Sequence, residues 1–200
     1  MRTLPIIFLL IAVLPARNWC EDVSFQAGGG PAIPSTPEGF TQIYKTGWSI
    51  AGGMGFIISP LVVLTGSVEY SRFPFDDADF VRLFGFSNSG YVISGGDRSI
   101  ITATMNTRFL LSRNRNMVCP YFVAGIGFAH FSQAEATVAG FSPIIGAHSE
   151  SAVLIHGGGG IDIPASDHVS LFLEGRYDLA LIQMNTTAFW PISAGIRVGV

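Results

Sequence analysis

The chain has 200 residues, which suits one domain of ordinary size. Hydrophobic residues make up 48% of it and charged residues 12%, about half of the charged share of ordinary soluble domains. This composition excludes intrinsic disorder, and the 11 basic residues against 14 acidic ones argue against nucleic acid as a partner. So few charges would cover a soluble surface poorly, and the composition favours a membrane protein.

The N-terminal segment has the pattern of a secretory signal peptide. Arg2 precedes an uncharged apolar stretch from Leu4 to Leu14, which is too short to span a bilayer. We therefore expect residues 1–20 to be a signal peptide and residues 21–200 to form the mature domain. An anchor helix that is retained is the alternative.

Three later stretches without Asp, Glu, Lys or Arg, at 48–68, 116–134 and 179–196, could be taken for membrane-spanning helices. Proline interrupts each of them, and side-chain character changes with a period of two rather than 3.6. From Val62 to Ser71, apolar or small residues alternate with more polar ones. This alternation is typical of a transmembrane β-barrel and leaves a helical inner-membrane protein as a weaker alternative.

Eight such segments follow one another along the chain. They cover about 22–31, 46–58, 61–72, 99–111, 119–131, 151–163, 168–179 and 189–200. Long connections at 32–45, 73–98, 132–150 and 180–188 alternate with short ones at 59–60, 112–118 and 164–167. The sequence therefore predicts an all-β fold, an eight-stranded antiparallel up-and-down transmembrane β-barrel preceded by a signal peptide, with both termini on the side of the short turns.

Two motifs resemble a known family. The segment Gly157–Leu179, with Glu174-Gly175-Arg176-Tyr177 near its end, and the segment Pro120–Ser132 are similar to strands of the OmpA-like outer-membrane β-barrels. The resemblance covers about residues 22–200 and implies an eight-stranded barrel in a bacterial outer membrane. Its partners would be outer-membrane lipid, lipopolysaccharide and the barrel-assembly machinery. The chain departs from the family at Val200, where a terminal Phe is usual.

The side of each strand that we expect to face inward carries most of the charged residues. These are Glu69, Arg108, Asp162, Glu174, Arg176, Asp178 and Arg197. Side chains fill the interior of an eight-stranded barrel, and buried charges must be paired. We expect a plug of ion pairs, with a narrow, low-conductance pore as the alternative.

Catalytic patterns are weak. His130-Phe131-Ser132, with Glu135 or Glu150 nearby, resembles the His-x-Ser pattern of outer-membrane lipid A deacylases, in which Ser132 would be the nucleophile and His130 the base. No pair of histidines has the spacing of metal ligands, and Cys119 is best interpreted as an apolar filler. We expect no enzymatic activity, no cofactor and no metal, with a deacylase-like esterase as the alternative.

Aromatic residues suggest two further roles. In the long connection 73–98, Asp residues precede Phe80, Leu83 and Phe84, a spacing that predicts a short amphipathic helix. It would pack on the barrel rim or offer a surface to an extracellular ligand. Five other aromatic residues lie near predicted strand ends, where we expect interfacial girdles: Trp48, Tyr70, Tyr121, Tyr177 and Trp190. Together these observations predict a structural or adhesin-like outer-membrane protein.

Overall fold

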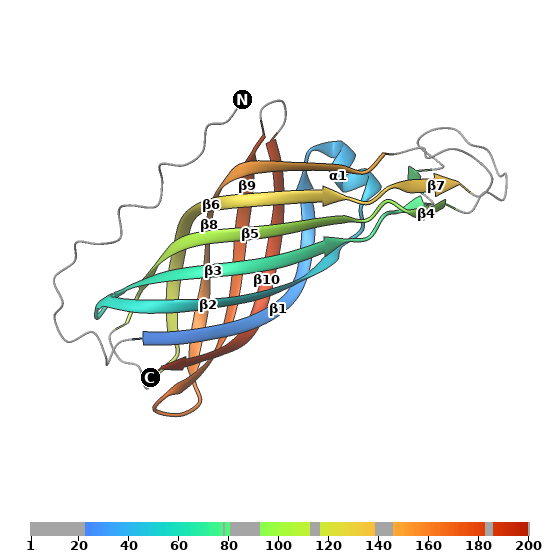
Figure 1. Cartoon of the computed structure of the whole chain (residues 1–200). Helices are drawn as coiled ribbons and strands as arrows, with labels where there is room; N and C mark the ends of the chain where they lie inside the picture. The colour runs from blue at the N-terminus through green and yellow to red at the C-terminus, as the bar shows by residue number, and fades with distance from the viewer. Residues whose placement is uncertain are drawn as a thin grey trace, which may run out of the picture.

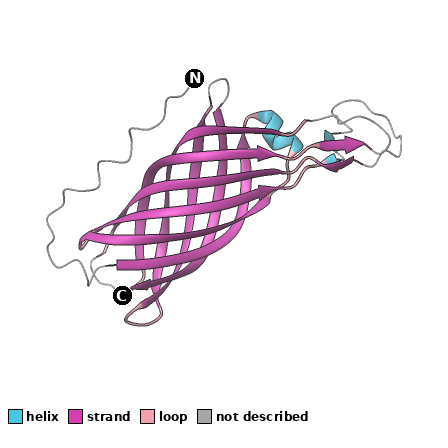
Figure 2. Ribbon diagram, viewed as in Figure 1, coloured by secondary structure: helices cyan, strands magenta, loops and turns pink. Residues whose placement is uncertain are grey.

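The structure, a computed structural model, describes residues 23–77, 79–80, 93–112, 117–138, 146–182 and 186–199, so the expected signal peptide lies outside it. Most described residues belong to eight long antiparallel strands (Figures 1 and 2). These are β1 (Val23–Thr36), β2 (Gly47–Ser59), β3 (Val62–Phe73), β5 (Arg98–Leu110), β6 (Cys119–Gln133), β8 (His148–Pro164), β9 (Val169–Leu181) and β10 (Thr186–Gly199). The prediction of eight strands is confirmed.

Each strand pairs with its neighbours in the chain, and β1 pairs with β10 to close the barrel. The closing ladder runs from Ser24 opposite Gly199 to Thr36 opposite Ala188. Closure matters because an open edge in hydrocarbon would leave peptide groups without partners, at several kcal/mol each. The up-and-down topology predicted from the sequence is therefore the one observed.

Several strands are longer than predicted, and β1 and β8 extend by the most residues. β1 continues through Pro31 and Pro34 to Thr36, and β8 begins at His148 rather than at residue 151. Both extensions remain paired, β1 with β10 and β8 with β6. The expected long connection at 180–188 is in fact short, because β9 continues to Leu181 and β10 already begins at Thr186.

The two ends of the barrel differ. β1 begins and β10 ends at the end of the barrel that carries the β2–β3, β5–β6 and β8–β9 connections (Figure 1). We call this the turn end. The opposite, loop end carries the helix α1 (Glu38–Ile43) and the short strands β4 (Ile93–Gly95) and β7 (Ala136–Val138). None of the helices in the described ranges is long and apolar enough to cross a membrane.

Side chains alternate across the barrel wall as the period of two requires. In β3, Val68 is 57% exposed whereas its neighbour Glu69 is 2% exposed. In β6, Ile126 is exposed and Val123 is buried. The outer surface is consequently an apolar band, and the polar side chains of the strands are gathered inside.

The loop end is closed by a cluster of buried aromatic side chains, which we call the aromatic cap. Its members are Phe40, Tyr44, Phe73, Phe75, Phe80, Phe131 and Phe189. α1 contributes Phe40, whose ring meets that of Phe73 edge to face at 5.0 Å. The cap was not predicted, because its members come from five separate segments that meet only when the barrel closes.

Beyond the cap, β4 and β7 pair in an antiparallel ladder that we call the loop ribbon (Figure 1). It continues the β5–β6 ladder outward, since β4 precedes β5 and β7 follows β6. Gly95 and Gly96 join it to β5 with φ values of 90° and 83°, which side-chain-bearing residues rarely adopt. A Cβ at Gly95 would lie 2.1 Å from the carbonyl oxygen of Glu135.

Candidate functional site

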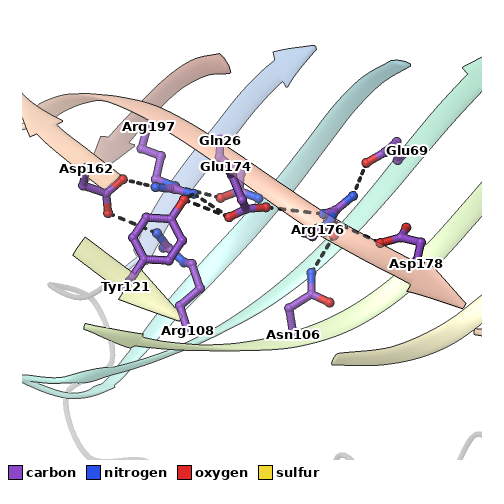
Figure 3. Close-up of polar contacts among 11 residues, drawn as sticks. Gln26, Glu69, Asn106, Arg108, Tyr121, Asp162, Glu174, Arg176, Asp178 and Arg197 are labelled. Atoms are coloured by element: carbon purple, nitrogen blue, oxygen red, sulfur yellow. Dashed lines mark hydrogen bonds and ion pairs between the residues drawn. The ribbon is translucent and has the colours of Figure 1, made fainter. Parts of the chain in front are cut away.

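The structure places all seven predicted interior charges inside the barrel and in contact with one another (Figure 3). They form two groups that share Glu174. One group lies toward the turn end around Arg197, and the other lies near the middle of the barrel around Arg176.

Arg197 of β10 is the centre of the first group. Its guanidinium donates to Gln26 Oε1 at 3.0 Å, to the Tyr121 hydroxyl at 2.9 Å and to Glu174 Oε2 at 3.3 Å, and it forms an ion pair with Asp162. The guanidinium carbon also lies 4.1 Å from the ring centroid of Phe172. Five partners on four other strands thus hold one side chain in place.

Arg176 of β9 is the centre of the second group. It forms an ion pair with Glu69 of β3 across the barrel, and it lies 3.5 Å from Glu174 Oε1 and 3.6 Å from Asp178 Oδ1. Ser71 donates to Glu69 Oε1 at 3.2 Å. The cation is therefore surrounded by three carboxylates, which offset the cost of removing its charge from water.

Hydroxyl and amide groups fill much of the remaining interior wall. Asn106 donates to Ser67 Oγ at 2.8 Å, and Ser67 in turn is 2.9 Å from Thr104 Oγ1. Together with the ion pairs and the aromatic cap, these contacts fill most of the barrel interior, and a cavity remains at the turn end. The interior has the character of a plug rather than of an open channel, which fits the narrow bore of eight-stranded barrels.

Tyr121 was expected at a membrane interface, and that expectation is wrong. Its ring is inside the barrel and 2% exposed, and its hydroxyl donates to Glu174 Oε2 at 2.8 Å. Counting alternate positions along Cys119–Gln133 would have revealed this, because Val123 and Phe131 share its inward face. Gln26 was missed as well, because the glycine-rich first strand hides the alternation.

The other four aromatic residues form pairs on the outer surface near the loop end. Trp48 and Tyr70 have ring centroids 5.5 Å apart, and Tyr177 and Trp190 have centroids 4.7 Å apart. Both tryptophans are exposed. Such positions suit the interfacial girdle of a membrane barrel.

Phe80 does not form the exposed surface that was considered for it. It is buried in the aromatic cap, with its ring centroid 5.3 Å from that of Phe75, and its N–H donates to the carbonyl of Asp76 in the start of a helical turn. The other two candidates, Leu83 and Phe84, lie outside the described residues.

Arg98 is a cap residue that the sequence did not point to. Its guanidinium lies between the rings of Phe40 and Phe131, with its carbon 5.3 Å and 4.8 Å from the two centroids, and donates to Glu150 at 3.2 Å. A cation held between two rings and a carboxylate fastens the cap to β5 and β8.

The structure does not assemble the esterase constellation. His130 faces outward, and its Nδ1 lies 2.9 Å from Ser151 Oγ on the adjacent strand. Glu150 pairs with Arg98 instead of orienting His130. Within the described ranges, no three His, Cys, Asp or Glu side chains are arranged to hold a metal ion.

No protein-family model and no curated protein matches the sequence. Solved structures do share its fold. Neisserial surface protein A is 18% identical with a TM-score of 0.61, over 89% of this chain and 97% of that one. A major outer membrane protein of Thermus thermophilus is 13% identical with a TM-score of 0.58, over 88% and 98%. Ail, the attachment invasion locus protein of Yersinia pestis, is 16% identical with a TM-score of 0.53, over 88% and 98%.

Closure of the strands, the apolar outer band and the interior ion pairs together describe a protein that crosses a bilayer. The chain has the fold of the small eight-stranded β-barrels of the bacterial outer membrane. This fold agrees with the OmpA-like architecture and the outer-membrane location that the sequence predicts.

Proposed function

We propose that this protein is a non-enzymatic surface-interaction protein, in which a closed barrel anchors external loops that bind an extracellular ligand. The observation that carries the proposal is the loop ribbon, which joins two different loops beyond the rim of the barrel (Figure 1). The turn end would face the periplasm and the loop end the cell exterior, as in other barrels with short turns and long loops.

Hydrogen bonds hold the loop ribbon where it meets the barrel. Gly96 donates to the carbonyl of Glu135 at 3.1 Å, and Ala134 donates to the carbonyl of Asp97 at 2.9 Å. Asp97 accepts from Arg72 at 2.6 Å and from the Phe75 N–H at 3.1 Å. A loop that is ordered before its ligand arrives loses less conformational entropy on binding, so this bracing supports a binding role.

The closed interior supports an anchoring role rather than transport. Ion pairs occupy the middle and the turn end, and the aromatic cap occupies the loop end. Two of the proteins with this fold are named for the cell surface or for attachment, and we extend that kind of role to this chain as part of the proposal.

Lipid contacts are a second part of the proposal. The apolar band would contact outer-membrane acyl chains, and the aromatic pairs Trp48–Tyr70 and Tyr177–Trp190 would lie at the level of the lipopolysaccharide. Insertion would use the barrel-assembly machinery, which acts on exported barrel chains.

Attachment of cells tests the proposal. The full-length protein is produced in a bacterial host without adhesins, and binding of these cells to cultured epithelial cells and to immobilised matrix proteins is counted. In the test variant, short Gly-Ser turns replace residues 79–96 and 135–147, which removes the loop ribbon. In the matched control variant, a Gly-Ser turn replaces residues 165–167 at the opposite end.

We expect attachment with the wild-type protein and the control variant and its loss without the ribbon. Equal attachment by all three proteins would contradict the proposal. A steady conductance in planar bilayers would favour the pore instead, and a change in lipid A mass on overproduction would favour the esterase.

A further inference from the structure

A polar patch interrupts the outer wall of the barrel toward the loop end. It consists of Ser99 of β5, His130 and Ser132 of β6, and Ser149 and Ser151 of β8, and we call these five residues the hydroxyl patch. They are neighbours in the ladders, because Ser132 lies opposite both Ser99 and Ser149, and His130 lies opposite Ser151. The surface-interaction role proposed above uses the loops beyond the rim and not this wall.

Several polar groups of the hydroxyl patch are available to a ligand. His130 Nδ1 lies 2.9 Å from Ser151 Oγ, and the Ser99 hydroxyl donates to the carbonyl of Ser132 at 3.4 Å. Within the described part of the chain, no residue is hydrogen-bonded to the hydroxyls of Ser132 and Ser149, and both of these residues are exposed. Hydroxyl and imidazole groups can each donate and accept, so the patch offers both functions.

The ladders show how high the hydroxyl patch lies on the wall. Partners followed around the barrel climb toward the loop end, because the row that starts at Ser24 beside the turn-end cavity arrives at Phe189 in the aromatic cap. With strands about 4.8 Å apart and tilted by about 45°, each step raises the level by roughly 3.4 Å. Ser132 is three such steps from Trp48, which places it about 10 Å above this girdle residue.

The wall beside the hydroxyl patch is still apolar at this level. Val153 lies two residues below Ser151 on β8 and is the ladder partner of Leu181 on β9, so Leu181 is nearly level with Ser151. Leu181 is 48% exposed. The patch is therefore not simply the part of the barrel that rises into water. It lies where the acyl chains of the bilayer meet the headgroups.

The hydroxyl patch is continuous with the lipid-facing band. Directly below it on the same three strands, Ile101, Phe128 and Val153 are exposed. A surface that is polar above and apolar below, at the edge of a bilayer, fits a ligand with the same division. Such a ligand is a lipid whose headgroup reaches the hydroxyls while its acyl chains remain on the band.

The chemistry of the hydroxyl patch favours a sugar as that headgroup. A phosphate only accepts hydrogen bonds and is usually bound by arginine or lysine, and the patch contains neither. Arg72, the ladder partner of Ser99, is already paired with Asp97 at 2.6 Å. Sugar hydroxyls both donate and accept, as the groups of the patch do.

We propose that the hydroxyl patch binds the saccharide headgroup of a glycolipid in the outer leaflet, while acyl chains of the same molecule lie against Ile101, Phe128 and Val153. The proposal rests on the orientation and the lipid contacts proposed above, and it adds a defined site for the headgroup. Lipopolysaccharide is the glycolipid that this leaflet offers.

Native mass spectrometry tests the proposal. The full-length protein is exported by a bacterial host, purified in detergent micelles and offered lipopolysaccharide that consists of lipid A and inner-core sugars. Phosphatidylglycerol, which has acyl chains and a phosphate but no saccharide, is the comparison lipid. We expect one retained lipopolysaccharide and about tenfold weaker retention of phosphatidylglycerol, because several hydrogen bonds are lost. Chemical removal of the phosphates from the lipopolysaccharide should leave its retention unchanged.

Variants locate the site. Replacing Ser132, Ser149 and Ser151 together by Ala removes three exposed hydroxyls, and we expect it to weaken lipopolysaccharide retention about tenfold or more. The matched control replaces the outward-facing Thr107 and the exposed Ser166 by Ala, which removes hydroxyls nearer the turn end and should leave retention unchanged. Heat-modifiable gel migration shows that both variants are folded.

Three results would overturn the proposal: equal retention of phosphatidylglycerol, equal retention by the two variants, or loss of binding when the phosphates are removed. Dimers in place of lipid-bound monomers would also contradict it, by pointing to a second copy of the chain on the patch. Attachment of cells through the loop ribbon is measured separately. Failure of either proposal therefore leaves the other to its own test.

Discussion

Replacing Arg176 by Met removes the central cation of the barrel while keeping a long apolar side chain. Three carboxylates lose their shared partner: Glu69, which it contacts directly, Glu174 at 3.5 Å and Asp178 at 3.6 Å. All four side chains are nearly fully buried. Breaking a buried ion pair by removing one partner costs about 3–5 kcal/mol, because the remaining charge is left in a medium of low polarity.

Urea unfolding in lipid vesicles, followed by tryptophan fluorescence in both directions, measures the loss. We expect Arg176→Met to lower the free energy of unfolding by about 3–5 kcal/mol. Adding Glu69→Gln to that variant removes one of the unpaired charges, so the double variant should be more stable than the sum of the two single effects predicts. Arg72→Met, at an exposed ion pair with Asp97, is the matched control and should shift the midpoint much less.

If Arg176→Met is no more destabilising than Arg72→Met, the interior ion pairs do not stabilise the barrel as proposed. If the effects of Arg176→Met and Glu69→Gln are simply additive, the two side chains do not form an energetically coupled pair.

Three further predictions concern packing and chemistry. Gly28→Val should abolish heat-modifiable folding, since a Cβ there would lie 2.7 Å from a backbone carbonyl and from a buried aromatic ring, whereas Gly66→Val, which points into open space, should fold. Phe131→Ala should cost about 3–5 kcal/mol in urea unfolding because it opens the aromatic cap, and Phe128→Ala on the lipid-facing surface should cost less. Mass spectra of lipid A should be the same with the wild-type protein and with Ser132→Ala, and a difference between them would restore the esterase hypothesis.

Some features could be read from local pattern alone. In β3 and β9 the alternation is regular, and it correctly assigns Glu69 and Arg176 to the interior and Val68 to the lipid side. The prediction for Tyr121 was wrong because it rested on the place of this residue near a strand end and not on its inward position in the alternation of β6. The local sequence pattern also did not point to Arg98, because its role depends on rings from α1 and β6.

By itself the sequence determined the number of strands, their order around the barrel and the side of the wall that most residues face. These properties follow from a period of two and from connections between adjacent segments, which are local. Tertiary structure alone decided which charge meets which, as when Arg176 of β9 reaches Glu69 of β3, and which loops join in the ribbon of β4 and β7. Such contacts depend on the register of every ladder and on closure through β1 and β10, and no short stretch of sequence contains that information.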